Sequence, residues 1–243
     1  MTNANSSRAK VGAHRALGTP LGSGPIWQAL GVLFRAHPWH GVTPGPEAPG
    51  VLTAFIEIVP SDTVKYELDK VSGLMRVRRP QKCSNVSPTP YGFVPQTLCA
   101  EQVAQRCEEQ CARAGVVGDD DPLDICVLAE NPLSHGDVLV EAVPIGGIKV
   151  LRGNQADDKI VAVLAGDASY GHFRDLQDCP AGLLERLKHY SSSCEPAPDG
   201  SAPSVEIVQI YGREEAHEVI RRSQADYASR FAGLSEFLAA ALT

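Results

Sequence analysis

The chain has 243 residues, of which 43% are hydrophobic and 21% are charged, enough apolar material for one sizeable core. Its 22 basic and 29 acidic residues give a formal net charge of −7, which argues against a general nucleic-acid-binding surface and suits a protein that recruits cations. Seven cysteines without a short repeated spacing indicate reduced thiols in an intracellular compartment, and no apolar stretch reaches membrane-spanning length.

Residues 1–46 differ in charge from the rest of the chain. Four of the 22 basic residues and none of the 29 acidic residues fall in this segment. An acid-free start rich in Ser, Ala and Arg is typical of an organelle transit peptide, whereas Gly-, Pro- and Ser-rich stretches equally suit a disordered tail and linker. Apolar residues over 26–35 predict one short amphipathic helix. We therefore expect an N-terminal extension over 1–46 and a cytoplasmic protein, with import into mitochondria or plastids as the alternative.

The remainder, residues 47–243, begins with strand patterns separated by turns and ends in helical patterns. Alternating and β-branched residues predict strands at 51–60, 64–70, 72–80, 124–130, 137–151 and 158–166. Apolar residues three and four apart predict amphipathic helices at 180–190 and 214–242. This order favours a single α+β domain, mainly β, built as an antiparallel barrel with flanking helices.

A further helical pattern over 99–118 ends at a glycine and is expected to be an insertion in this domain. It places Cys107 and Cys111 one helical turn apart. A zinc site needs two more ligands, which the neighbouring sequence does not obviously offer, so ordinary thiols are the favoured interpretation.

Four aspartates crowd the stretch GDDDPLDICVL over 118–128. Like charges this close repel one another and lose solvation when partly buried, so they need cations, unless the stretch is a solvated acidic turn. An EF-hand loop beginning at Asp119 fails, because its sixth position requires Gly and holds Asp124. The D-x-D-P-x-D cluster of Asp119, Asp121 and Asp124 before a strand instead predicts a Mg²⁺ site.

Acidic, basic and phenolic side chains recur in the other patterned segments. Each alone fits a solvated strand face or a core position. Together they suit a phosphate substrate clamped by metal ions, since carboxylates bind metals, cations bind phosphate oxygens, and phenols donate to phosphate or to metal-bound water. The candidates are Glu57, Lys65, Glu67, Arg79, Tyr91, Asp157, Lys159 and Tyr190.

The chain resembles the soluble family I inorganic pyrophosphatases, most closely their plant-type branch. The resemblance covers residue 36 to the end and lies in the stretches AHPWHG, KYELDK, YGFVPQTLC, DDDPLDICVL and DDKIVAV, in the family's order. It implies an OB-like five-stranded barrel with flanking helices and an active site on the barrel. It also implies hydrolysis of pyrophosphate to two orthophosphates with several Mg²⁺ ions as cofactors.

The resemblance also implies a role for each candidate residue. Asp119, Asp124 and Asp157 match metal ligands around the attacking water, and Asp121 matches the base that orients and deprotonates it. The residues that match phosphate-holding positions are Lys65, Arg79, Lys159 and Tyr190. Glu57, Glu67 and Tyr91 match supporting positions in the metal and water network, where the two glutamates belong to the metal set.

Four positions depart from the family's pattern. Arg152 stands in the stretch RGNQADDK where the family has another metal-binding Asp, and Arg78 replaces a frequent Asp. Ser87 replaces a usual Tyr, and Ser191 replaces a common Lys. One metal ligand and two phosphate-contacting groups are therefore missing, although the three aspartates of the loop are intact.

Two hypotheses follow from these departures. In the first, the protein is a working pyrophosphatase that uses fewer protein-held metals, with Arg152 contacting phosphate directly. In the second, it is a weakened or inactive paralogue that keeps the fold as a binding or structural subunit. A nucleic-acid-binding barrel is disfavoured, because the sequence lacks a basic, aromatic-lined groove. We expect pyrophosphate and phosphate as ligands and neither nucleic acid nor membrane as a partner, while the sequence leaves a homo-oligomer open.

Overall fold

Five strands of the chain pair into a closed ring. The structure is a computed structural model that describes residues 36–80, 86–193 and 205–241, with side chains described as far as Gly233. The strands are β1 (Leu52–Ile58), β2 (Val64–Leu68), β3 (Met75–Pro80), β4 (Tyr91–Phe93), β5 (Val117–Gly118), β6 (Asp124–Leu128), β7 (Val138–Arg152), β8 (Gln155–Leu164) and β9 (Val205–Gly212). Neighbours in the ring follow the order β8, β6, β4, β1 and β7, and a direct β7–β8 pairing closes it.

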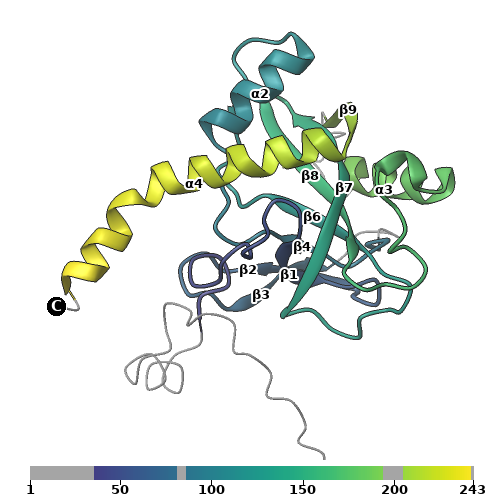
Figure 1. Cartoon of the computed structure of the whole chain (residues 1–243), viewed down its shortest axis with the longest axis horizontal. Helices are drawn as coiled ribbons and strands as arrows, with labels where there is room; N and C mark the ends of the chain where they lie inside the picture. The colour runs from purple at the N-terminus through teal and green to yellow at the C-terminus, as the bar shows by residue number, and fades with distance from the viewer. Residues whose placement is uncertain (1–35, 81–85, 194–204, 242–243) are drawn as a thin grey trace, which may run out of the picture. The chain divides into compact units, whose positions relative to one another are not determined.

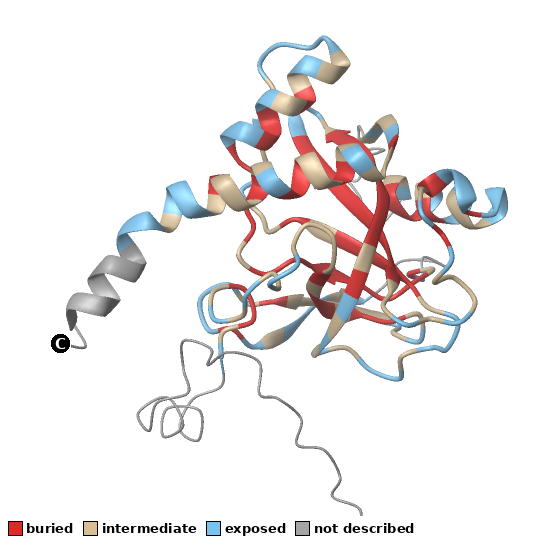
Figure 2. Ribbon diagram, viewed as in Figure 1, coloured by how far each residue is buried: buried red, intermediate tan, exposed pale blue. Residues whose placement is uncertain are grey.

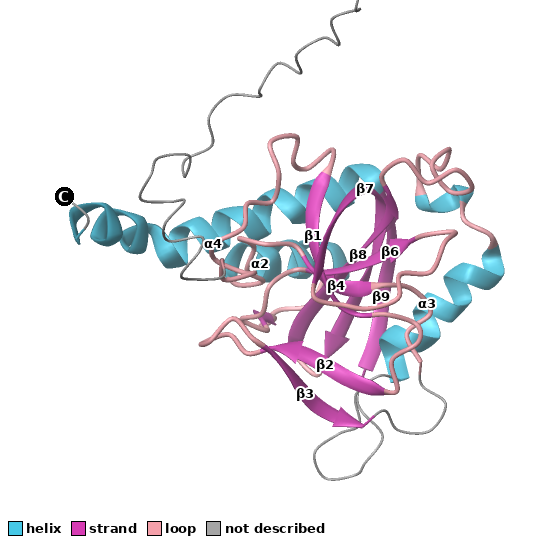
Figure 3. Ribbon diagram, turned by 90° about the horizontal axis from the view of Figure 1, so that it is seen from below, coloured by secondary structure: helices cyan, strands magenta, loops and turns pink. Residues whose placement is uncertain are grey.

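The predicted five-stranded barrel is confirmed as this ring, but one of its pairings is not antiparallel. The β6 and β8 strands run parallel, whereas the other four pairings of the ring are antiparallel. The reason is the path of the chain. In the sequence β7 lies between β6 and β8 and forms a tight antiparallel hairpin with β8, so β8 runs in the same direction as β6. The β5 and β9 strands extend the sheet beyond the ring, and β2 and β3 form a separate hairpin (Figure 3).

Side chains alternate between two packed clusters along the ring strands, as the two-residue period of a strand requires. Ile125 of β6 and Ile160 of β8 belong to a cluster completed by Val219 and Ile220 of α4 (Arg213–Ala241). Their sequence neighbours Cys126 and Val161 belong to the second cluster, completed by residues of α3 (Ala181–Ser193) and of the short 3-10 helix η1 (Leu176–Asp178). Figure 2 accordingly shows the buried residues concentrated in the strands.

The helices lie outside the ring. The α4 helix runs along β7 and along α2 (Glu101–Cys111), the helix of the expected insertion, and α3 lies at another side of the ring (Figure 1). Within α2, the sulfur atoms of Cys107 and Cys111 are 4.0 Å apart, and both cysteines are free thiols. No helix in the described part of the chain is long and apolar enough to cross a membrane.

The compact unit that holds these elements begins at His37. Trp39 is only 5% exposed, packs with Phe55 and Phe93, and donates from Nε1 to the Thr97 carbonyl across 2.8 Å. The expected boundary after residue 46 therefore falls inside this unit, because one aromatic side chain anchors the preceding segment in the core. The helix predicted over 26–35 lies outside the described residues.

Candidate active site

One cavity of about 270 Å³ collects most of the side chains that the sequence singles out. They come from the loop before β6, from β8, from β1 and β4 of the ring, from the β2–β3 hairpin and from α3. The predicted residues that line it are Glu57, Lys65, Glu67, Tyr91, Asp119, Asp121, Asp124, Asp157 and Tyr190. The remaining two are placed differently: Lys159 is buried beside it, and Arg79 is partly buried on β3 with Nη1 3.5 Å from the Pro80 carbonyl.

Lys159 lies at the centre of a buried ion cluster. Its ammonium is 2.6 Å from Oδ2 of Asp124, 2.8 Å from Oδ1 of Asp157 and 3.1 Å from the hydroxyl of Tyr91, and the residue is 1% exposed. The parallel β6–β8 register places Asp124 opposite Lys159, and the alternation along β8 turns Asp157 to the same face. Tyr91 also donates its hydroxyl to Asp124, and its ring meets the edge of Tyr190 at a centroid distance of 5.9 Å.

Arg152 supplies Asp157 with a second cation. Arg152 pairs with Gln155 across the β7–β8 hairpin, which makes Asp157 its diagonal neighbour on the same face. The guanidinium donates from Nε to Oδ2 of Asp157 across 2.7 Å. Burial alone favours a raised pKa for Asp157, but Lys159 and Arg152 outweigh it and hold the pKa of this carboxyl below its usual range.

In Asp119 and Glu57 burial outweighs the nearby cations, so the pKa is raised instead of lowered. Burial, followed by repulsion from Asp157 and Asp124, raises the pKa of Asp119 to about 8. Burial likewise raises the pKa of Glu57 to about 8, although the backbone amide of Leu68 donates to its Oε1 across 2.7 Å. These acids have too little positive charge around them to ionise at their ordinary pKa.

The donor chemistry of the cavity fits Mg²⁺. Oxygen ligands are what this ion prefers, and it binds through one or two carboxylates while keeping several waters. Within the described residues no three acidic, His or Cys side chains converge as a closed metal cage. The carboxylates Asp124 and Asp157 instead contact Lys159 and Arg152, while Asp119 carries the raised pKa expected of an acid that a divalent cation would stabilise.

Sequence reasoning missed three cationic contacts of the cavity. Lys70, in the turn after β2, pairs with Asp121, and its ammonium lies 6.0 Å from the ring of Trp39. Arg78 lines the cavity and lies 3.4 Å from Oε2 of Glu67. Arg76 approaches the other oxygen of Glu67 at 3.5 Å. Lys70 belongs to the stretch KYELDK, so the sequence offered a hint of its importance. Only the turn of the β2–β3 hairpin brings it to residues 119–123, the aspartate loop.

The two serine replacements do not reach the cavity. Ser87 is 1% exposed and donates to the Thr89 carbonyl across 2.7 Å. Ser191 is equally buried and donates to the Leu187 carbonyl across 2.8 Å within α3. Both hydroxyls therefore satisfy backbone groups, and neither serine lines the described cavity.

Comparisons with known proteins agree with this geometry. The family model described as inorganic pyrophosphatase matches residues 54–228, more than half of the chain. An inorganic pyrophosphatase of Chlamydia caviae is 43% identical over 80% of this chain and 92% of its own length, and soluble inorganic pyrophosphatase 3 of Arabidopsis thaliana is 36% identical over 79% of each.

A solved structure shows that the similarity extends to the fold. The inorganic pyrophosphatase of Thermus thermophilus superposes with a TM-score of 0.65 at 27% identity, over 79% of this chain and 99% of that one. Family model, relatives and fold point the same way, and the chain belongs to the inorganic pyrophosphatase family.

Proposed function

We propose that this protein hydrolyses inorganic pyrophosphate to two orthophosphates with Mg²⁺ as cofactor. The observation that carries the proposal is the single cavity in which the aspartate loop and Asp157 meet Lys65 and Tyr190. Such a mixture of carboxylates, cations and phenols suits a highly anionic substrate that arrives with divalent ions. Similarity to the chlamydial and plant pyrophosphatases supports the same activity.

The metal ligands in this proposal are Asp119, Asp124 and Asp157, with Glu57 and Glu67 in support. Bound Mg²⁺ supplies neutralising charge to the phosphates and lowers the pKa of a coordinated water. Among these groups Asp119 and Glu57 have raised pKa values, because burial outweighs the cations near them. Both carboxylates therefore gain from a bound divalent ion.

Asp121 acts as the base. Its carboxylate lines the cavity, is half exposed, and has Lys70 beside it. A water molecule loses a proton to this carboxylate and attacks one phosphorus atom. The bond from that phosphorus to the bridging oxygen then breaks, and the second orthophosphate leaves. No covalent enzyme intermediate is required, and the proton held by Asp121 returns to solvent.

Lys65 and Tyr190 bind phosphate oxygens from two walls of the cavity. Lys159 is buried beside the cavity and holds Asp124 and Asp157 in place through its contacts of 2.6 and 2.8 Å. Arg78 and Arg152 bring further guanidinium groups to the cavity lining and compensate for the phosphate contacts that Ser87 and Ser191 do not make. This arrangement favours a working enzyme with fewer protein-held metals over an inactive paralogue.

The test is orthophosphate release from pyrophosphate by the purified protein, first in EDTA and then with Mg²⁺ in excess. The proposal expects release only with Mg²⁺, and far slower release from a phosphate monoester, which lacks the second phosphoryl group. A folded protein that releases no phosphate from pyrophosphate would favour the binding or structural subunit.

A further inference from the structure

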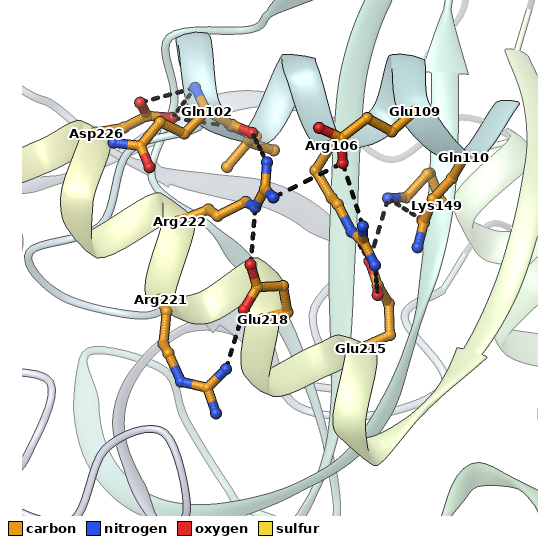
Figure 4. Close-up of polar contacts among 11 residues, drawn as sticks. Gln102, Arg106, Glu109, Gln110, Lys149, Glu215, Glu218, Arg221, Arg222 and Asp226 are labelled. Carbon is orange, nitrogen blue, oxygen red and sulfur yellow. Dashed lines mark hydrogen bonds and ion pairs between the residues drawn. The ribbon is translucent and has the colours of Figure 1, made fainter. Parts of the chain in front are cut away.

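Asp226, on α4, caps a helix to which it does not belong. Its carboxylate is 3% exposed and accepts backbone N–H bonds from Ala100 at 3.0 Å, Gln102 at 2.9 Å and Val103 at 3.1 Å. These amides form the start of α2, where Ala100 offers no side-chain cap of its own. Figure 4 shows Asp226 and Gln102 facing each other across the two helices. The first amides of α2 therefore depend on a carboxylate 124 residues away in the sequence.

The capped segment also forms the backing of the aspartate loop. The amide of Cys99 donates to the Asp121 carbonyl across 2.8 Å, and the amide of Asp120 donates to the Cys99 carbonyl across 3.1 Å. The two backbones are so close that a Cβ on Gly118 would lie 2.1 Å from the Cys99 carbonyl oxygen. Any displacement of residues 98–100 therefore moves the backbone between Asp119 and Asp121.

The α4 helix holds this assembly at two more points. The carbonyl of Ser223 accepts the amide of Leu98 across 2.9 Å, and Arg230 donates from Nη2 to Oδ1 of Asp120 across 3.0 Å. Ser223, Asp226 and Arg230 are three and four residues apart, so they share one face of α4. This face contacts the loop directly at Asp120 and indirectly through the segment 98–100.

We propose that Asp226 is a positioning residue for the aspartate loop, so that α4 fixes the geometry in which Asp119 and Asp121 meet Mg²⁺ and water. Its relevance to catalysis rests on the proposed function. Without the carboxylate, the amides of Ala100, Gln102 and Val103 lose their acceptor, which is costly at Ala100 and Val103 because both residues are buried. The start of α2 then shifts, and the loop loses its backing.

The experiment compares Asp226→Ala with Glu218→Ala, a matched truncation of an acid on the same helix, because an asparagine would keep an oxygen that accepts from the same amides. Glu218 pairs with Arg221 and Arg222 of the same helix, at 3.0 and 2.9 Å. Calorimetric titration of the substrate-free proteins with Mg²⁺ is expected to give an about tenfold higher dissociation constant for Asp226→Ala and an unchanged one for the control. High Mg²⁺ is expected to restore most of the hydrolysis rate, a rescue that a general loss of folding would not allow.

A second pair keeps the test decisive if Asp226→Ala does not fold. Arg230→Met leaves the cap intact and removes the exposed contacts of Arg230 to Asp120 at 3.0 Å and to Glu101 at 3.9 Å, and Arg221→Met is its control. A smaller rise of the same Mg²⁺ dissociation constant is expected for Arg230→Met. Unchanged Mg²⁺ binding in folded Asp226→Ala, or in Arg230→Met if that is the only folded variant, would overturn the positioning role. Wild-type protein that binds Mg²⁺ without hydrolysing pyrophosphate would overturn the proposed function instead.

Discussion

Arg152 and Asp157 are diagonal neighbours on the β7–β8 hairpin, joined by a hydrogen bond of 2.7 Å from Nε to Oδ2. The other oxygen of Asp157 accepts from Lys159 at 2.8 Å. Both oxygens of this acid thus contact cations that belong to the protein. Arg152 therefore has a structural role at the edge of the cavity, where it helps to neutralise Asp157.

Replacing that arginine with an acid tests whether its charge has been recruited. Arg152→Asp places a second carboxylate beside Asp157, so Asp157 loses one of its two cations and the cavity gains negative charge. We expect more Mg²⁺ bound per chain and an about tenfold lower hydrolysis rate at limiting Mg²⁺. Equilibrium dialysis and phosphate release measure the two effects.

The control for this variant is Arg113→Asp. Arg113 is exposed and pairs with Glu206 at 2.7 Å, outside the lining of the cavity. Its replacement is expected to leave both the amount of Mg²⁺ bound per chain and the hydrolysis rate unchanged. A large gain of Mg²⁺-dependent rate in Arg152→Asp would contradict the recruitment of Arg152 and identify the native site as a damaged one.

Lys159 is expected to be the main stabilising charge of the metal-free site. Lys159→Met leaves Asp124 and Asp157 without the buried ammonium they share, and removal of one partner from a buried ion cluster costs about 3 kcal/mol of unfolding free energy. Urea denaturation in EDTA measures this loss, and added Mg²⁺ should recover part of it.

Lys188→Met is the matched change at an exposed pair. Lys188 contacts Glu185 at 2.7 Å on the surface of α3, where such pairs contribute about 0–1 kcal/mol. Equal losses of unfolding free energy in the two variants would contradict the prediction that Lys159 stabilises the metal-free protein more than an exposed lysine does.

Mg²⁺ binding should release protons near neutral pH. The pKa of Asp119 is raised to about 8, so the folded protein holds a proton that the unfolded chain would lose at a lower pH. The stability this contributes is present at acid pH and is lost as pH rises through about 8. Asp157, whose pKa is held below its usual range, stays ionised throughout this window.

Because Mg²⁺ binds the ionised carboxylate, its affinity is expected to rise with pH up to about 8. Titration calorimetry at pH 7, in two buffers of different ionisation enthalpy, measures the protons released. Asp119→Asn should release fewer protons than the wild type. An identical heat in both buffers with wild-type protein would show that Asp119 is already ionised, against this account.

Local patterns were sufficient for most of the fold and for the acidic part of the site. The strands expected over 137–151 and 158–166 appear as Val138–Arg152 and Gln155–Leu164, and the helix expected over 180–190 as Ala181–Ser193. Their periodicity is a property of neighbouring residues, so it can be read without knowledge of the fold. The D-x-D-P-x-D cluster is equally local.

Long-range relationships were not accessible in this way. The parallel β6–β8 pairing depends on the path of β7, and β9 was missed although Val205–Gly212 forms a strand at the sheet edge. The contact of Lys70 with Asp121 and the cap of Asp226 on α2 join residues far apart in the sequence. No spacing rule relates such positions, because tertiary packing alone brings them together.

The central claim is that Asp121 activates water for Mg²⁺-dependent hydrolysis of pyrophosphate. The most direct measurement is orthophosphate release across a Mg²⁺ titration for wild-type protein and Asp121→Ala, with Glu130→Gln as an exposed acid-to-amide control two residues after β6. The account predicts robust release by the wild type and the control, and loss of release in Asp121→Ala at every Mg²⁺ concentration. Equal release by Asp121→Ala and wild type, or none from folded wild-type protein, would contradict it.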